Sequence, residues 1–378
     1  MTNDVMRVAE ANADDPLAAS KLVAALGHGP FALVVAFVAP SDSMSELVRQ
    51  LTDALYPAPV IGCTTAGEIG TDGYAEGTVV VTAFPAINFC AETILVPDLG
   101  DIDRQSLVGE VIRARRSLTH AEPDWIHDFA FLMVDGLSAR EDALTAAIAP
   151  GLGSTPLFGG SAADGTRFLE TFTFYQGKAL RNAAVLTLVR TRCPLRVFKF
   201  DHFIPTAQRM VVTGADPTSR RVYSINAEPA AAEYARLLGK DPTQLTAFTF
   251  AAHPVVVRLG GQHHVRSIQQ MDDNGDLIFF SAIDEGLVLT LAEPMDMETH
   301  LANEFSNLAN QGAPSAILAC DCILRRMEAQ ESQVTGRISS ILKANNVAGF
   351  STYGEQVNAM HVNQTLTGVA FYSPESAK

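Results

Sequence analysis

Short runs of apolar residues recur along the chain and alternate with stretches of helical periodicity. Three of these runs, Phe31–Val38, Phe129–Val134 and Ala316–Cys320, have the length and the continuous apolar character of buried strands. Helix-like stretches follow them, for example at Ser45–Leu55 and Arg326–Lys343. Because strands that alternate with helices are typical of α/β units, we predict an α/β fold with mixed sheets.

A glycine-centred signature follows each of these strand–helix pairs, and another strand follows each signature. Glycine directly after a strand permits a positive φ or a close backbone approach, so a structural turn is the simplest interpretation. The repeated unit predicts two related domains. The three signatures are Gly62-Cys63-Thr64-Thr65-Ala66-Gly67-Glu68, Gly159-Gly160-Ser161-Ala162-Ala163-Asp164 and Gly349-Phe350-Ser351-Thr352-Tyr353-Gly354-Glu355, and the strands after them are Thr78–Phe84, Ala183–Val189 and Leu366–Tyr372.

We divide the chain into an N-terminal extension or helix (1–24), an N-terminal domain (25–221) and a C-terminal domain (222–378). The boundary rests on the loop-like sequence Ala215–Arg220. Beyond it we expect helices and β-hairpins. The expected elements are helices at Pro229–Leu238 and Met297–Leu308, and strand pairs around Gly260-Gly261 and Asn274-Gly275.

Composition narrows the class of protein. A chain of 378 residues with 47% apolar residues is long enough for two globular domains. The 27 basic and 42 acidic residues give a net charge of −15, which disfavours nucleic-acid binding. We expect no membrane span and, from the start MTNDVMRVAE, no signal peptide. Five cysteines, an odd number, do not indicate a disulfide framework, so we expect a cytoplasmic protein.

Common catalytic motifs are absent from the sequence. It contains no phosphate-binding glycine loop, no GxSxG, no CxxC pair and no HExxH. A Cys63 nucleophile would need a base such as His361 nearby, and the aligned positions Gly160 and Phe350 show that the repeat does not require a thiol. We therefore expect no enzyme and assign no catalytic residue.

The pair Cys320 and Cys322 is the densest cysteine site. With further ligands these thiols would bind zinc, or they would respond to oxidation. A single C-x-C pair is weak evidence for a metal, and buried cysteine is ordinary core material. Two interpretations of this cysteine pair therefore remain, a zinc or redox switch and a structural role in the core.

Histidines on apolar faces suggest a different chemistry. Alternation along Leu195–Ile204 places Arg196, Phe198, Phe200 and His202 on one face. Pairing across the predicted hairpin sets Val257 opposite His264 and Val255 opposite Arg266, with His253 on the same face. Haem binding needs an apolar wall, an imidazole and cations for the propionates. The alternative is histidine that is hydrogen-bonded in the core.

A small-metabolite site is the other interpretation of the signatures. Turn amides can hold a carboxylate, and a histidine nearby can complete such a site. The candidate residues are Gly62, Cys63, Thr64, Thr65, Ser351, Thr352 and His361.

The signatures GCTTAGE (62–68) and GFSTYGE (349–355), together with HVNQT (361–365), resemble the paired N- and C-terminal FIST domains. The resemblance covers roughly residues 25 to 372. FIST domains are ligand-sensing modules of signalling proteins, so the resemblance implies a sensor. With no room for an output domain, we expect it to signal by contact.

A narrower resemblance is to the haem-binding, nitric-oxide-sensing FIST subgroup. It implies haem as cofactor, nitric oxide as effector and a histidine kinase as partner, with control of biofilm or cyclic-di-GMP signalling. When this resemblance is combined with the strand faces that carry histidines, we rank the candidate iron ligands in the order His202, His264 and His253. Homo-oligomerisation stays open. The segments that carry this resemblance are DHFIPT, FTFAAHPVVVRLGG, DNGDLIFFSAIDEGLVLTLAEP and ILACDCILRR.

Overall fold

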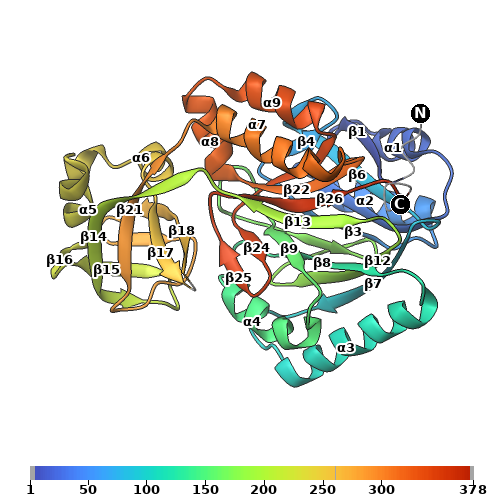
Figure 1. Ribbon diagram of the computed structural model, residues 1–378, viewed down its shortest axis with the longest axis horizontal. Helices are drawn as coiled ribbons and strands as arrows, with labels where there is room; N and C mark the ends of the chain where they lie inside the picture. The colour runs from blue at the N-terminus through green and yellow to red at the C-terminus, as the bar shows by residue number, and fades with distance from the viewer. Residues whose placement is uncertain (1–4, 260, 375–378) are drawn as a thin grey trace.

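The computed structural model describes residues 5–259 and 261–374. Within these residues, a body of three sheets carries a smaller inserted module at one side (Figure 1). Parallel and antiparallel strands occur together in the sheets of the body. The predicted α/β class with mixed sheets is therefore confirmed.

Each predicted repeat forms the same strand arrangement. The first strand pairs in parallel with the second, beyond a helical crossover, and antiparallel with the third. The three units have the following strands: β2 (Phe31–Val38), β3 (Val60–Thr64) and β6 (Thr78–Pro85); β8 (His127–Val134), β9 (Leu157–Ser161) and β12 (Ala184–Thr191); β22 (Ala316–Cys322), β23 (Val347–Thr352) and β26 (Leu366–Phe371).

The crossover helices of the first two units are α2 (Met44–Leu55) and α4 (Glu141–Leu152). The third crossover was predicted as one helix, Arg326–Lys343, and this is wrong. It consists of α8 (Ile323–Glu331) and α9 (Thr335–Ala344). Gln333 between them has φ 56°, a left-handed conformation that an α-helix does not continue through.

Hairpins are exchanged between the units in a cycle. The hairpin after each signature pairs with one edge of another unit's sheet, and a further strand pairs with the opposite edge of each sheet. All three sheets therefore have the same strand order. Their outer strands are β1 (Arg7–Asn12), β7 (Phe89–Val96) and β13 (Leu195–Phe200). The exchanged hairpins are β4–β5 (Glu68–Gly70, Gly73–Ala75) on β23, β10–β11 (Thr173–Tyr175, Lys178–Leu180) on β3 and β24–β25 (Glu355–Val357, Met360–Val362) on β9.

The N-terminal segment contributes to the body. Residues 1–24 were predicted as an extension or helix. In the structure β1 pairs with β6 of the first sheet, and α1 (Ala18–Leu26) follows it. The segment predicted as an extension or helix thus contains a strand and the start of a helix.

The three sheets share one central core. Phe37 of the first unit stacks on Phe350 of the third, with ring centroids 4.7 Å apart. A Cβ on Gly160 of the second unit would lie 2.8 Å from the Phe350 ring and 3.1 Å from Cys320. The aligned signature positions thus differ in size because Cys63 and Phe350 belong to one close-packed cluster and Gly160 lies against it.

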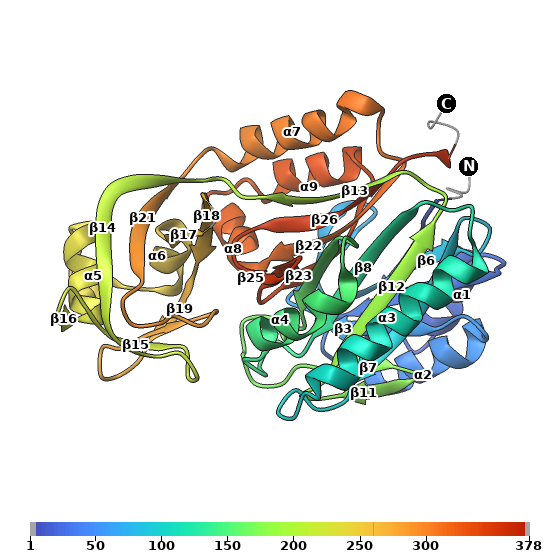
Figure 2. The same cartoon turned by 60° about the horizontal axis from the view of Figure 1, so that its bottom comes forward.

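Helices cover the outer faces of the sheets. α1 and α2 pack on the first sheet, α3 (Arg104–Ala121) and α4 on the second, and α7 (Met297–Leu308) and α9 on the third. Figure 2 shows α3 lying across the second sheet. The predicted helix Met297–Leu308 is confirmed.

The inserted module lies between β13 and α7 and is built around one antiparallel sheet. The predicted boundary at residue 222 falls within the hairpin that begins this sheet. Both predicted strand pairs form, although Gly260 of the first turn lies outside the described residues. The module contains β14 (Phe203–Asp216), β15 (Arg221–Ile225), β16 (Glu228–Pro229), α5 (Ala230–Leu238), α6 (Ala247–Ala252), β17 (Val255–Leu259), β18 (Gln262–Arg266), β19 (Ile268–Met271), β20 (Leu277–Phe279) and β21 (Val288–Pro294).

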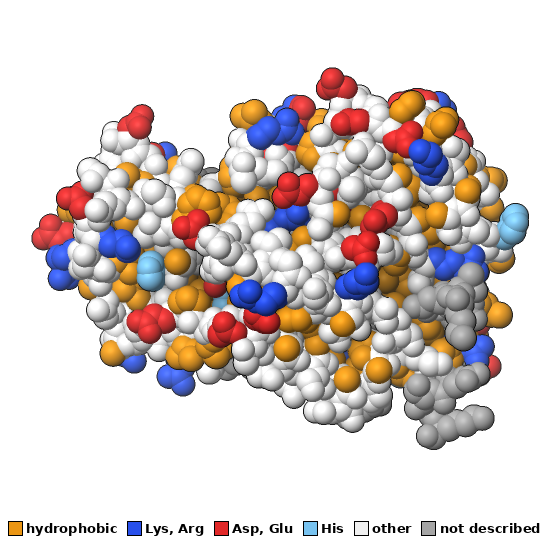
Figure 3. Space-filling model, turned by 90° about the horizontal axis from the view of Figure 1, so that it is seen from above, with side chains coloured by type: hydrophobic (Ala, Val, Ile, Leu, Met, Phe, Trp, Pro, Cys, Tyr) orange, Lys and Arg blue, Asp and Glu red, His pale blue; other side chains and the backbone are white. Residues whose placement is uncertain are grey.

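On the face shown in Figure 3, basic and acidic side chains are interspersed. In the described part of the chain, no helix is long and apolar enough to cross a membrane.

Candidate functional site

The signature loops interlock at the ends of the parallel strands. The Ala66 amide donates to the Ser351 carbonyl at 2.9 Å, and the Ser351 amide donates to the Gly67 carbonyl at 2.7 Å. The Ala163 amide donates to the Thr64 carbonyl at 2.9 Å. Each loop thus holds a neighbouring unit, which explains why the signature repeats.

A pocket of about 430 Å³ opens beside these loops. Residues 65–68 of the first signature form one wall and residues 164–167 after the second form another. Ile323, Arg326 and Met327 of α8 form a third. The carboxyl ends of strands, where several elements converge, are where ligands bind in α/β sheets.

Arg326 fixes the inner end of this pocket. One guanidinium nitrogen donates to the Glu68 carbonyl and to the Ser351 hydroxyl, both at 3.3 Å. The other donates to the Ala75 carbonyl at 2.7 Å and to the Glu76 carboxylate at 3.2 Å. Arg326 is buried, and these hydrogen bonds join α8 of the third unit to the signature loop of the first.

Glu68 and Glu355, at aligned signature positions, make the same contacts. Glu68 accepts from the Thr78 amide at 3.1 Å and from its hydroxyl at 2.8 Å. Glu355 accepts from the Thr365 amide at 3.1 Å and from its hydroxyl at 2.7 Å. Burial raises the pKa of both carboxyl groups. These acids tie each loop to the strand that follows it.

Asp164 organises the second wall of the pocket. Its buried carboxylate accepts from the amides of residues 168, 169 and 170 at 2.8, 3.0 and 3.0 Å, and from the Tyr353 hydroxyl. Arg167, next to it, is largely exposed at the pocket. Cationic and anionic groups therefore line the same pocket.

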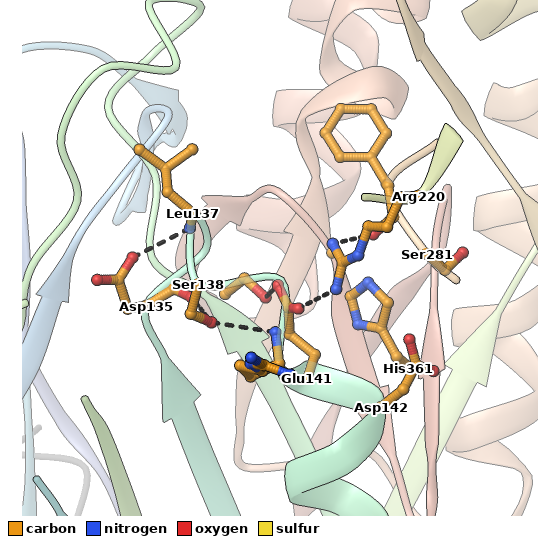
Figure 4. A network of polar contacts seen from close by, with 12 residues as sticks. Asp135, Leu137, Ser138, Glu141, Asp142, Arg220, Ser281 and His361 are labelled. Atoms are coloured by element: carbon orange, nitrogen blue, oxygen red, sulfur yellow. Dashed lines mark hydrogen bonds and ion pairs between the residues drawn. The ribbon is translucent and has the colours of Figure 1, made fainter. Parts of the chain in front are cut away.

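A second polar cluster, the polar junction, joins the body to the inserted module (Figure 4). Glu141 at the start of α4 pairs with Arg220 of the module, and both side chains are buried. Arg266 donates to the His361 carbonyl at 3.2 Å. Asn363 accepts from the Ser281 hydroxyl at 3.0 Å. His361 and Asn363 of the HVNQT segment thus dock the module on the body.

His202, the first-ranked iron ligand, lies in the link between β13 and β14 rather than on a strand. It is fully buried, with Nε2 2.9 Å from the Glu328 carboxylate and Nδ1 2.8 Å from the Arg325 guanidinium. Arg325 only donates, so Nδ1 accepts and the ring proton lies on Nε2. Both ring nitrogens therefore already have partners.

The module histidines occupy separate surroundings. The predicted pairs Val257–His264 and Val255–Arg266 are confirmed. His253 follows α6 as its C-terminal cap, so its predicted place on the strand face is wrong. His264 is buried in the module, whereas His253 is only partly buried.

The aromatic face predicted for haem is already covered. Phe198 and Phe200 stack at 4.4 Å, and the Phe200 ring packs edge-on to Phe305 of α7 at 5.6 Å. Arg196 is exposed. Haem would need to displace α7 and the partners of His202, so these residues do not fit the group in this conformation, and haem binding stays a prediction.

The cysteines of the predicted sites, Cys63, Cys320 and Cys322, are buried in apolar surroundings. Cys63 and Cys320 belong to the central core, and Cys322 to a cluster at the module. Burial raises the pKa of all three thiols, which disfavours the reactive thiolate. Within the described residues, no group of three or more His, Cys, Asp or Glu side chains is placed to hold a metal. Zinc binding stays a prediction.

Most of the residues predicted to bind a metabolite have structural roles instead, and few line the pocket. Gly62 admits no side chain, since a Cβ there would lie 2.0 Å from the Ala36 carbonyl oxygen. The Thr64 amide donates to the Phe172 carbonyl, and the Thr352 hydroxyl donates to the Ser161 carbonyl. With the Ser351 amide also paired, only Thr65 of the set lines the pocket, while His361 belongs to the polar junction.

Sequence reasoning missed the charged residues that define both sites. Arg326 lies in the first half of α8, four residues after the end of β22, and Glu141 is the first residue of the crossover helix α4. The available signal was a charged residue in a helix that follows a buried strand. It did not reveal that these side chains point inward.

Comparison with known families agrees with this architecture. The FIST N domain model matches residues 32–228, and the FIST C domain model matches residues 230–358. The second match spans most of the inserted module and much of the third unit. A search of curated proteins finds no match. The match over more than half of the chain shows that it belongs to the FIST family of sensory signal-transduction proteins.

Proposed function

We propose that this FIST protein senses a small polar metabolite, such as an amino acid, in the pocket between its signature loops. The observation that carries the proposal is the pocket itself, walled by elements of all three units. Its volume of about 430 Å³ is in the range of small-molecule sites. Such a site is better placed for a signal than one within a single unit, because its ligand contacts all three.

The charges in the pocket favour a molecule that carries both signs. Arg167 supplies an exposed cation and Glu76 an exposed carboxylate, whereas Arg326 and Asp164 are already bonded to protein groups. An amino acid has one group for each. A ligand that binds one arrangement of the loops more tightly shifts the protein toward that arrangement, which a partner protein then reads by contact.

Thermal unfolding of the full chain with each of the twenty amino acids tests the proposal. A ligand at 100 times its Kd stabilises the folded state by about 2.7 kcal/mol, so we expect a concentration-dependent rise in Tm for a subset. Ala66→Trp fills the pocket and should remove that rise. Ala121→Trp, at an exposed position at the end of α3, is the matched control. A rise that survives Ala66→Trp, or none with any amino acid, contradicts the proposal.

Haem with nitric oxide as effector and a histidine kinase as partner is the competing proposal, and the subgroup resemblance is its support. An absorption titration of the purified chain with haem separates the two. A saturable Soret band near one equivalent, moved by nitric oxide and lost in His202→Ala, would favour haem. A titration without saturation would leave the metabolite proposal.

A further inference from the structure

A second pocket, of about 310 Å³, opens at the amino ends of β22 and β23, whereas the pocket between the signature loops lies at the carboxyl ends of β2 and β3. Its walls come from β1 and α1 at the start of the chain, from the turn of the exchanged hairpin β4–β5, and from the starts of β22 and β23 (Figure 1). Its volume is in the range of small-molecule sites. Neither function proposed above uses this pocket.

Most of the residues that line this pocket are apolar. Met6 and Val8 of β1 form one side, and Leu26 of α1 and Val347 of β23 form others. Ligand pockets have this composition, in which apolar walls surround a few placed polar groups. The walls therefore suit a guest with a short hydrocarbon chain, and the polar groups decide what else the guest must carry.

Arg7 of β1 supplies a fixed positive charge to the pocket. Its Nη1 donates to the Leu26 carbonyl at 3.0 Å and to the His28 carbonyl at 2.8 Å. The guanidinium also lies 5.4 Å from the centroid of the Phe31 ring, within the range of a cation–π contact. These contacts use both Nη1 protons and hold the side chain in one place. They are made to neutral groups, so they leave its charge unmatched.

Two nitrogens of the Arg7 guanidinium have no hydrogen-bond partner among the described residues. Nε is enclosed, but Nη2 is not, so its two N–H groups can reach a guest in the pocket that Arg7 lines. Within the same residues no carboxylate forms an ion pair with Arg7. The other cation, Lys343, is paired with Asp72 at 2.6 Å, and Glu10 beside the hairpin accepts from the Thr71 amide at 3.0 Å. The pocket therefore has one unmatched positive charge.

We propose that this pocket is a second binding site and that it takes a small monocarboxylate with a short apolar chain. The carboxylate accepts from Arg7 Nη2, since a guanidinium pairs well with a carboxylate, and the chain lies against the apolar walls. One negative charge matches the one unmatched cation, which favours a monocarboxylate over a doubly charged phosphate ester. The guest also touches the turn of the hairpin β4–β5, and Glu68 of the same hairpin lines the pocket between the signature loops. Both pockets therefore share one exchanged element.

NMR of the full chain with ¹³C-methyl-methionine tests the site, because Met6 lines this pocket and Met327 lines the pocket between the signature loops. The variants Met6→Leu and Met327→Leu assign the two signals. We expect butanoate, titrated at constant ionic strength, to shift the Met6 signal saturably and to leave the Met327 signal in place. Butanamide and butylamine, which have the same chain length, should bind at least about tenfold more weakly. A Met6 signal that does not move, an equal response to butanamide, or a Met327 shift with the same midpoint would overturn the proposal.

Two variants assign the response to Arg7 and its pocket. Arg7→Gln keeps an amide donor but removes the charge, so butanoate should bind about tenfold more weakly. Arg116→Gln, at an exposed position of α3, removes the same charge and should leave binding unchanged. Ala25→Trp, at an exposed position that lines the pocket, fills it without altering Arg7 and is the second variant if Arg7→Gln does not fold. Undiminished binding in Arg7→Gln or Ala25→Trp, or an equal loss in Arg116→Gln, would overturn the assignment. The amino-acid proposal is read separately, at Met327.

Discussion

At the scale of single residues, the surroundings of His202 keep its imidazole neutral. Burial lowers the pKa of His202, and the adjacent Arg325 charge lowers it further against the opposing effect of Glu328. The unfolded chain therefore takes up a proton near the ordinary value of about 6.5, before the folded protein does. The stability that neutral His202 contributes is complete above that pH, and it is lost as the pH falls toward the folded pKa.

The variant His202→Asn tests this assignment, because an asparagine oxygen still accepts from Arg325 but does not titrate. We expect the difference in unfolding free energy between wild type and variant, measured with urea from pH 5 to pH 8, to shrink below about pH 6.5. Glu68 and Glu355 also affect the pH dependence, since burial raises their pKa, but they are common to both proteins and cancel. His120→Asn at an exposed position is the control. A pH-independent difference would refute the assignment.

At the scale of elements, hairpin exchange means that a mutation in one unit acts on another. Phe174 lies in β10, within the chain of the second unit, but it packs in the core of the first sheet and pairs with Gly62 of β3. Phe174→Ala should cost about 3–5 kcal/mol of stability. Hydrogen exchange should then accelerate in β3 before it does in β9. Leu169→Ala, 72% exposed, should stay within about 0.5 kcal/mol of wild type. Faster exchange in β9 first would contradict the exchanged pairing.

The elements also show what the sequence predicts well. β2 and α7 begin and end where their apolar patterns predict, because each buries a continuous run or stripe against one layer. The exchanged partners of β4, β10 and β24 were not predictable, since a hydrophobic pattern records burial and not which neighbour supplies the next strand. Of the signature residues predicted to bind a metabolite, only Thr65 lines the pocket. Arg326 and Glu141 were missed because a charged side chain in sequence gives no sign that it is paired inside.

At the scale of the whole molecule, the Glu141–Arg220 pair joins the body to the inserted module. Its side chains are 2% and 10% exposed, and Arg220 also donates to the Phe280 carbonyl within the module. Breaking one partner of a buried ion pair leaves an uncompensated charge and costs about 3–5 kcal/mol. Some of that cost should appear as undocking of the module.

We expect Arg220→Met and Glu141→Leu each to accelerate amide exchange at residues 361–365, where the module docks, and to enlarge the radius of gyration measured by X-ray scattering. The double variant should recover part of the loss, because two apolar side chains replace a buried pair more readily than one unpaired charge does. A double-mutant cycle should therefore give a coupling of about 0.5–3 kcal/mol. Additive losses with unchanged exchange at residues 361–365 would show that the pair is local to α4. Recovery would show that the docking of the module depends on this buried charge pair.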